Sequence, residues 1–130
     1  MNKIKALTFD TGGTILDWHS GFRDALEIVG DKYNYKRDWA SLANELRRRS
    51  LKSMLNLGEN EPPQYNFDDA HRFILEALIK ENNLVDFTKE DIQYIAYETV
   101  HNLTCWEDFP CTLPKLKKKL IVCSFTILSY

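Results

Sequence analysis

The sequence has little of what marks several classes of protein. None of its apolar runs approaches the roughly 20 residues that a membrane-spanning helix needs. Positive and negative side chains nearly balance, and the formal net charge of −2 gives no general attraction to nucleic acid or to an anionic membrane. Internal repeats and low-complexity segments are absent. We therefore expect neither a nucleic acid nor a membrane as partner, and the 130 residues suffice for one compact domain.

Cysteine is also scarce. The three cysteines, Cys105, Cys111 and Cys123, are odd in number and show no CxxC spacing. This pattern favours free thiols in a reducing compartment over a disulfide framework. The lysines near the N-terminus lead directly into an apolar strand pattern and not into a signal peptide. Together these features predict a cytoplasmic location.

The most informative stretch is KIKALTFDTGGTILD, which runs from Lys3 to Asp17. Its apolar first half has the length of a buried strand and stops at a carboxylate, Asp10. Open α/β sheets bind their ligands at the carboxyl ends of strands. Gly12 and Gly13 permit a sharp turn and a close approach to the backbone, and Thr14 adds a hydroxyl. The residues alone leave two interpretations open, a ligand site or an ordinary strand-to-helix turn with a solvated carboxylate.

Apolar residues then recur every three or four positions in four successive segments, as one face of a helix requires. We predict helices over residues 20–33, 38–55, 66–81 and 88–103. Their expected N-caps are Ser20, Asp38, Asn66 and Thr88, the last in a capping box with Asp91. A loop is predicted over residues 56–64, which contain one glycine and two prolines.

The pattern changes again after the fourth helix. Phe109 precedes a proline, which disfavours helical geometry, so residues 106–110 are predicted to be a non-helical connection. A short helix is expected over residues 112–118, with Pro114 near its first turn. Residues 120–123 then form an apolar run that is typical of a second buried, parallel strand and that ends at Ser124.

The segment FDTGGTILD resembles the first motif of the haloacid dehalogenase (HAD) superfamily, an apolar strand followed by Asp-x-x-x-Thr. The resemblance implies an α/β fold, in which a Rossmann-like core is interrupted by a four-helix cap. Core residues 1–16 would carry the first strand, residues 17–104 the helical cap, and residues 105–130 the linker, the short helix and the second core strand. Only the first two parallel strands of such a core are present in the sequence.

The resemblance also implies roles for individual residues. Asp10 takes the position of the nucleophile, and Thr14 that of the residue that orients the carboxylate or binds the transferred group. Ser124 takes the position of the second motif's hydroxyl, which hydrogen-bonds the leaving or transferred group. Backbone N–H groups after Asp10 and Ser124 would contribute to substrate binding, which assigns Thr11, Gly12 and Phe125 to the site.

The residue two places after the nucleophile separates the branches of this superfamily. Its phosphatases carry a second Asp there as acid and base, whereas this sequence has Gly12, which cannot transfer a proton. The haloacid dehalogenases also lack that Asp, because a halide leaves without protonation, and they need no cofactor. They usually have an aromatic residue where Gly12 stands. The alternatives are therefore a magnesium-dependent phosphonatase or phosphatase and a non-catalytic interaction protein.

A 2-haloacid is a small anionic substrate whose carboxylate must be held. In the dehalogenases an arginine on a cap helix takes part in this, and the guanidinium group suits it because it offers a fork of donors. The sequence has Arg47, Arg48 and Arg49 in a row. At 100° per residue Arg47 lies at the edge of the apolar face, so Arg47 is predicted to bind the substrate. The other interpretation is that all three face solvent.

The superfamily's third motif, a Lys or sometimes an Arg, and its later acidic or polar motif should follow Ser124, but the printed sequence stops at Tyr130. Two parallel strands are too few for an independent sheet. We therefore expect a fragment, one half of a two-chain protein, or a homodimer that completes the sheet. For this chain alone we expect an HAD-like hydrolase with little or no turnover.

Overall fold

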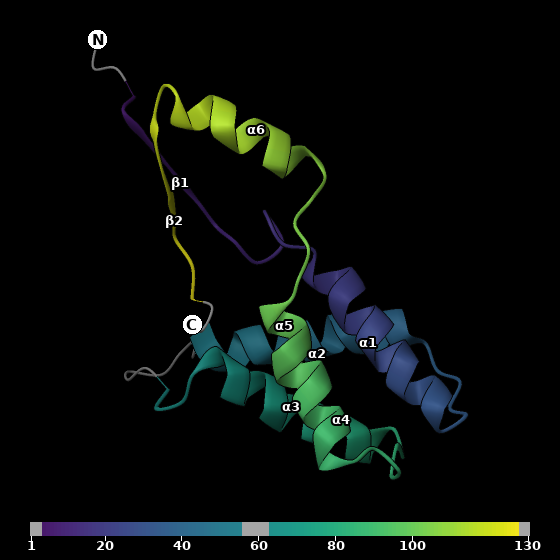
Figure 1. Ribbon diagram of the computed structural model, residues 1–130. Coiled ribbons are helices and arrows are strands. Elements are labelled where there is room, and N and C mark those ends of the chain that lie inside the picture. Colours follow the sequence, from purple (N-terminus) through teal and green to yellow (C-terminus); the bar gives the residue numbers. More distant parts are fainter. Residues whose placement is uncertain (1–3, 56–62, 128–130) are drawn as a thin grey trace.

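The computed structural model describes residues 4–55 and 63–127, which form a helical unit and a separate two-stranded sheet (Figure 1). The predicted loop over residues 56–64 lies mostly outside the described residues. The elements in chain order are β1 (Ala6–Phe9), α1 (Trp18–Lys32), α2 (Trp39–Leu55), α3 (Phe67–Glu81), α4 (Lys89–Gln93), the π-helix η1 (Tyr94–Glu98), α5 (Thr99–His101), α6 (Asp108–Lys117) and β2 (Ile121–Ser124).

The two strands pair in parallel, although more than a hundred residues of chain separate them. Ala6 lies opposite Ile121 and Phe9 opposite Ser124. Parallel strands require a long crossover connection, and the helices provide it. This confirms the predicted α/β fold with two parallel strands and an inserted helical region, and it brings the carboxyl ends of both strands to one edge.

The prediction that both strands are buried is wrong for the described residues. Ile4, just before β1, is 74% exposed, and Ile121 in β2 is 64% exposed. The cause is visible in Figure 1: α1 to α5 pack on one another at a distance from the strands, and α6 lies along the pair. Apolar side chains of the sheet are therefore accessible to solvent.

The hydrophobic core lies in the helical unit, where α2 packs against both α1 and α3. Its fully buried side chains come from every predicted helix face, which is why the helical periodicity of the sequence was informative. The largest apolar ones on these faces are Phe22, Phe67, Leu26, Leu46, Leu75 and Ile95, and Leu84 between two of the helices is also fully buried. No helix among the described residues has both the length and the apolar character that a membrane crossing requires.

Three predicted helix starts are confirmed. Asp38 accepts a hydrogen bond from the Ser41 N–H (2.9 Å), and Asn66 accepts one from the Asp69 N–H (2.9 Å). Thr88 forms the expected capping box with its third helical residue. Each of these caps depends on residues three positions apart, so each was visible in the local sequence.

The predicted start of α1 is wrong. The helix begins at Trp18, and the N-cap is Asp17, whose carboxylate accepts a hydrogen bond from the Ser20 N–H (3.1 Å). Burial opposes the charge of Asp17, but the hydrogen bonds from Ser20 outweigh it and lower the pKa of Asp17. Ser20 is thus the donor at the third helical position and not the cap itself.

The fourth predicted helix has the expected extent but not a uniform geometry. It runs as α4, η1 and α5, with the wider π turn over Tyr94–Glu98. The Tyr94 carbonyl oxygen accepts two hydrogen bonds there, one from the Thr99 backbone N–H and one from the Thr99 hydroxyl (2.9 Å). Periodicity alone does not distinguish this local change from a regular α-helix.

The predicted connection over residues 106–110 is also wrong, because α6 begins at Asp108 and includes Phe109 and Pro110. Pro110 is the third residue of the helix, and a first-turn residue has no N–H acceptor within the helix to lose. Pro114 then lies inside α6 and not near its first turn, and the helix ends at Lys117. The preference against helix before a proline is thus overridden here at the helix start.

Candidate functional site

Asp10 and Thr14 come together at the turn that follows β1. The Thr14 hydroxyl donates a hydrogen bond of 3.0 Å to Asp10 Oδ2. The chain folds back because the N–H groups of Ile15 and Leu16 both donate to the Thr11 carbonyl oxygen, each at 3.0 Å. The hydrogen bond from Thr14 holds one oxygen of the Asp10 carboxylate in a defined orientation at the carboxyl end of the strand.

One glycine of this turn, Gly13, is required by its surroundings. Gly13 has a φ of 103°, which side chains rarely adopt, and a Cβ there would lie 2.9 Å from Trp18 Nε1. The Trp106 indole donates a hydrogen bond of 2.9 Å to the Gly13 carbonyl oxygen, and the Trp106 N–H donates one to the Ile15 carbonyl oxygen. The linker before α6 thereby fixes the turn across 93 positions of the chain.

Arg47 reaches this turn from α2. Its Nη2 lies 3.5 Å from the Gly12 carbonyl oxygen, a long hydrogen bond. The guanidinium carbon lies 4.9 Å from the ring centre of Phe67 and 5.7 Å from that of Trp18, within the range of cation–π attraction. Burial lowers the pKa of Arg47, and the negative charge of Asp10 opposes that shift. The structure thus presents a partly desolvated cation to the carboxylate.

The two neighbouring arginines are engaged elsewhere. Arg48 makes two hydrogen bonds of 2.7 Å to Glu45, and Arg49 pairs with Glu45 (2.6 Å) and Glu81 (2.7 Å). Within the described part of the chain, no carboxylate lies within hydrogen-bond distance of Arg47. Of the three arginines, Arg47 therefore has donors available for an anionic ligand.

Asp10, Gly12 and Arg47 line one cavity of about 340 Å³, together with Phe125 and Thr126, which follow β2. The remaining lining residues are apolar: Leu51, Leu55 and Ile127. The cavity thus combines a carboxylate, a guanidinium group and an apolar wall, which are the elements of a site for a small anion with an apolar part.

The other predicted site residues are placed less directly. Ser124 ends β2 opposite Phe9, at the same edge as Asp10, but it is not among the residues that line the cavity. Phe125 lines the cavity, but its N–H donates to the Phe9 carbonyl oxygen (2.7 Å) and is thus already used in the sheet. The Thr11 hydroxyl is buried and has no hydrogen-bond partner among the described residues.

Sequence reasoning did not identify Trp106, Phe67, Leu51 or Leu55 as parts of the site. Trp106 donates its hydrogen bond to Gly13, which lies 93 positions earlier in the chain, so no local pattern could reveal it. Leu51 and Leu55 share a helix face with Arg47, since they follow it by one and two turns. The four-residue spacing of Arg47, Leu51 and Leu55 was the signal that could have placed both leucines beside the arginine.

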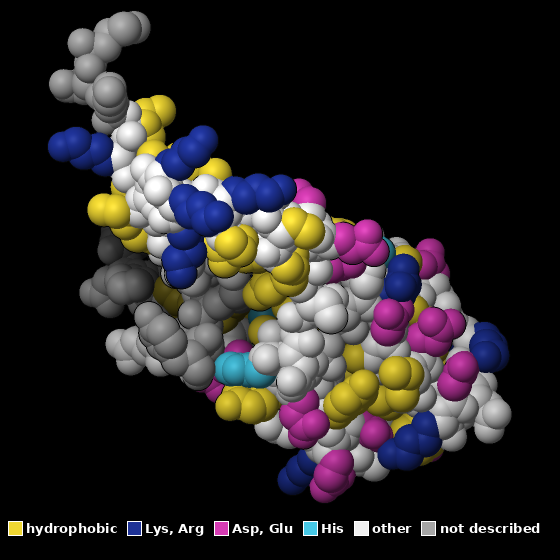
Figure 2. Space-filling model, turned by 45° about the horizontal axis from the view of Figure 1, so that its top comes forward, with side chains coloured by type: hydrophobic (Ala, Val, Ile, Leu, Met, Phe, Trp, Pro, Cys, Tyr) yellow, Lys and Arg dark blue, Asp and Glu magenta, His cyan; other side chains and the backbone are white. Residues whose placement is uncertain are grey.

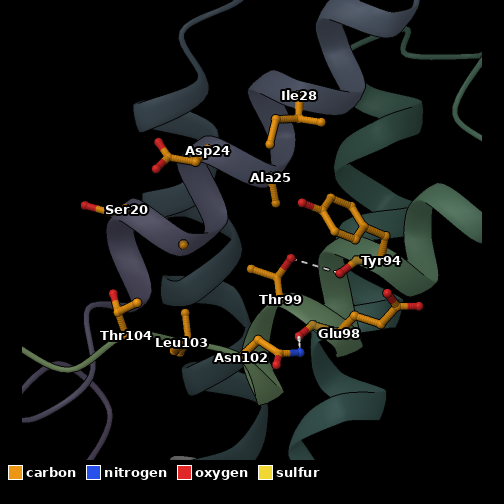
Figure 3. A pocket seen from close by; sticks show the side chains of 11 residues that line it. Ser20, Asp24, Ala25, Ile28, Tyr94, Glu98, Thr99, Asn102, Leu103 and Thr104 are labelled. Carbon is orange, nitrogen blue, oxygen red and sulfur yellow. Dashed lines mark hydrogen bonds between the residues drawn. The ribbon is translucent and has the colours of Figure 1, made fainter.

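A second hollow lies between α1 and the η1–α5 segment (Figure 3). Several of its polar groups are already used by the helices, since Thr99 bonds the Tyr94 carbonyl oxygen and the Asn102 amide donates to the Glu98 carbonyl oxygen (2.8 Å). A Cβ at Gly21 would lie 2.3 Å from Leu103 Cδ2, so the bare glycine makes room for that leucine. This hollow is better explained by helix packing than by ligand binding.

The charges are distributed unevenly over the surface. Figure 2 shows positively charged side chains gathered over α6, which lies beside the two strands, whereas positive and negative side chains are mixed over the helical unit. The lysines at positions 115, 117, 118 and 119 are all exposed. Across residues 4–55 and 63–127, no three His, Cys, Asp or Glu side chains are grouped as metal ligands would be.

Comparison with known proteins gives a consistent result for the fold. No family model matches the sequence, and no curated protein matches it either. Solved structures do match. They include the defluorinating L-2-haloacid dehalogenase Rha0230 (TM-score 0.82, 24% identity), the L-2-haloacid dehalogenase PA0810 (0.80, 23%) and the L-2-haloacid dehalogenase of Xanthobacter autotrophicus with chloropropionic acid covalently bound (0.73, 18%).

These matches cover 95%, 98% and 98% of this chain but 51%, 53% and 48% of the solved chains. The chain therefore spans about half the length of the structures that it matches. At these identities the likeness concerns the fold. The chain has the α/β fold of the haloacid dehalogenase superfamily, with a helical cap region as in the L-2-haloacid dehalogenases.

Proposed function

We propose that this chain carries the nucleophile and the anion-binding arginine of a hydrolase that acts on 2-haloacids. The observation that carries the proposal is that Asp10, oriented by Thr14, and Arg47 line the same cavity. In this proposal residues 17–104 act as a cap over a core built from residues 1–16 and 105–130. The match to dehalogenase structures supports it at the level of fold.

In the proposed reaction Arg47 binds the substrate carboxylate and thereby orients the neighbouring carbon. An Asp10 oxygen forms a bond to that carbon while the carbon–halogen bond breaks, and the halide leaves with the bonding electron pair. The product is an ester of Asp10, which water then hydrolyses. A halide needs no proton on leaving, so the reaction does not require an acid at Gly12. One matching structure holds covalently bound chloropropionic acid, in agreement with such an intermediate.

Charge balance within the cavity is part of the proposal. The described residues that line the cavity include no lysine, so Arg47 is the cation that faces Asp10 there. A single arginine then serves both the nucleophile and the substrate anion. We therefore expect ester formation to be easier to observe than repeated turnover.

The test uses the protein in excess over substrate, so that a single turnover suffices. We expect halide release from 2-chloropropionate, unaffected by EDTA, and loss of that release in Asp10→Asn. Phosphate release from phosphonoacetaldehyde that EDTA abolishes would instead identify a magnesium-dependent phosphonatase. Release of neither product by folded protein would contradict both enzymes and favour a non-catalytic interaction protein.

A further inference from the structure

The cavity beside Asp10 extends along α2. Leu51 and Leu55 follow Arg47 at four and eight positions, so the three side chains lie in one row on the same helix face. At 1.5 Å of rise per residue, Leu51 is about 6 Å and Leu55 about 12 Å along the axis from Arg47. The charged end and the apolar end of the cavity are therefore separated by two helical turns.

Other apolar residues of the cavity come from outside α2. The segment after β2 also lines the cavity, and there Phe125 is 78% and Ile127 49% exposed, while Leu55 of α2 is also 49% exposed. These are large apolar side chains that border a shared cavity and remain in contact with solvent. Burial of their surface by an apolar group would be favourable.

A short haloacid does not use this apolar end. Its carboxylate and its halogen-bearing carbon must both lie near Arg47 and Asp10, and an acetate or propionate skeleton ends there. The cavity volume of about 340 Å³ is at the lower end of the range for small-molecule sites. It is still larger than the volume that an acetate or propionate skeleton fills. The row from Arg47 to Leu55 has space for a longer tail.

We propose that the substrates of this site are 2-haloacids with a medium-length alkyl chain, of about six to eight carbons in total. The proposal rests on the proposed function, since it places the acid and its reacting carbon at Arg47 and Asp10. The alkyl tail lies along Leu51 and Leu55 and contacts the Phe125 ring. Burial of one methylene group favours binding about fourfold, so a few of them give a measurable preference.

The test compares 2-bromopropionate with 2-bromooctanoate as reagents for Asp10. Ester formation is followed on the tryptic peptide from residue 6 to residue 23, which contains Asp10 and no cysteine, so alkylation of the three thiols does not interfere. We expect the second-order rate constant to be at least about tenfold higher for 2-bromooctanoate.

Variants locate the preference in the cavity. Leu55→Asn is expected to lower the rate with 2-bromooctanoate about fivefold and to reduce the ratio of the two rates by a similar factor. Ile28→Asn is the matched control, because Ile28 is a similarly exposed apolar residue (59%) on α1 and outside this cavity. It should affect neither reagent. Circular dichroism confirms that both variants are folded.

The outcomes separate the two proposals. Equal rates for the two acids, or equal slowing of both by Leu55→Asn, would overturn the chain-length preference and leave the nucleophile in place. No ester on Asp10 with either acid, in folded protein, would overturn the proposed function itself and the substrate class with it.

Discussion

The guanidinium group of Arg47 lies 3.5 Å from the Gly12 carbonyl oxygen, 35 positions earlier in the chain. This contact joins the helical unit to the turn after β1 at the point where Asp10 leaves the strand. Phe67 and Trp18 flank the same guanidinium group from α3 and α1. Three helices thus place one cation beside the candidate nucleophile.

The first prediction concerns that cation. Arg47→Lys keeps the charge but loses the fork of donors, and it should weaken binding of a 2-haloacid by about tenfold to a hundredfold, since charge-assisted hydrogen bonds contribute roughly 1.5–3 kcal/mol. The dissociation constant can be measured with the Asp10→Asn protein as background, so that no ester forms. Arg48→Lys, on an exposed side chain paired with Glu45, should leave affinity unchanged. Equal losses in both variants would argue against a specific role for Arg47.

The second prediction concerns the hydroxyl beside the nucleophile. Thr14→Val preserves the shape of the side chain and removes the hydrogen bond to Asp10, so ester formation should slow by about tenfold or more. Thr14→Ser should retain most of the rate. Because Thr14 is exposed, the urea midpoint of either variant should stay close to that of the parent protein. An unchanged rate in Thr14→Val would show that this hydrogen bond does not orient the carboxylate.

The third prediction concerns acid stability. Burial of Asp91 opposes its charge, but hydrogen bonds from Thr88, Tyr33 and Lys32 outweigh burial and lower the pKa of Asp91 to about 2. A carboxyl group with a lowered pKa in the folded state stabilises the fold above its ordinary pKa of 3.8, and that stabilisation is lost as the pH falls toward 2.

Asp91→Asn should therefore lower the free energy of unfolding by about 2 kcal/mol at pH 7, and the difference from the parent protein should shrink between about pH 4 and pH 2. Urea unfolding at a series of pH values measures this. Asp24→Asn, at an exposed ion pair with Arg23, is the control and should change stability by less than about 0.5 kcal/mol. A pH-independent effect of Asp91→Asn would refute the assignment.

The fourth prediction concerns packing between α1 and α2. A Cβ at Gly30 would lie 2.2 Å from Trp39 Cζ2, and Trp39 is only 6% exposed. Gly30→Ala should therefore destabilise the protein by about 1–3 kcal/mol, even though alanine favours the helix. The double variant with Trp39→Leu should lose less free energy of unfolding than the sum of the two single variants, because the smaller leucine removes the clash with the alanine. Strict additivity would show that the two residues do not interact.

Local signals in the sequence predicted much of this fold. The caps at Asn66 and Thr88 depend on partners three positions away, and the row of arginines could be oriented by helical angle alone. Ser20 was predicted as the N-cap of α1, but Asp17 is the cap in the structure, because the turn after Gly13 ends earlier than the apolar pattern indicated. Phe109 and Pro110 were misassigned because the rule against helix before proline is weak in the first turn of a helix.

Other features depend on long-range contacts. Trp106 bonds to the Gly13 carbonyl oxygen across 93 positions, and Phe67 underlies Arg47 from a different helix. Neither contact leaves a pattern in the neighbouring sequence. The motif therefore predicted Asp10 and Thr14, whereas the surroundings that hold Gly13 and Arg47 required the three-dimensional structure.

The central claim is that Asp10 is the nucleophile, and peptide mass analysis of samples quenched with acid during a single turnover with 2-chloropropionate tests it most directly. We predict that the tryptic peptide from residue 6 to residue 23 gains the mass of the acid less hydrogen chloride, that fragmentation places this gain on Asp10, and that Asp10→Asn shows none. Halide release with an unmodified Asp10 throughout the time course, or an equal mass gain in Asp10→Asn, would contradict the account.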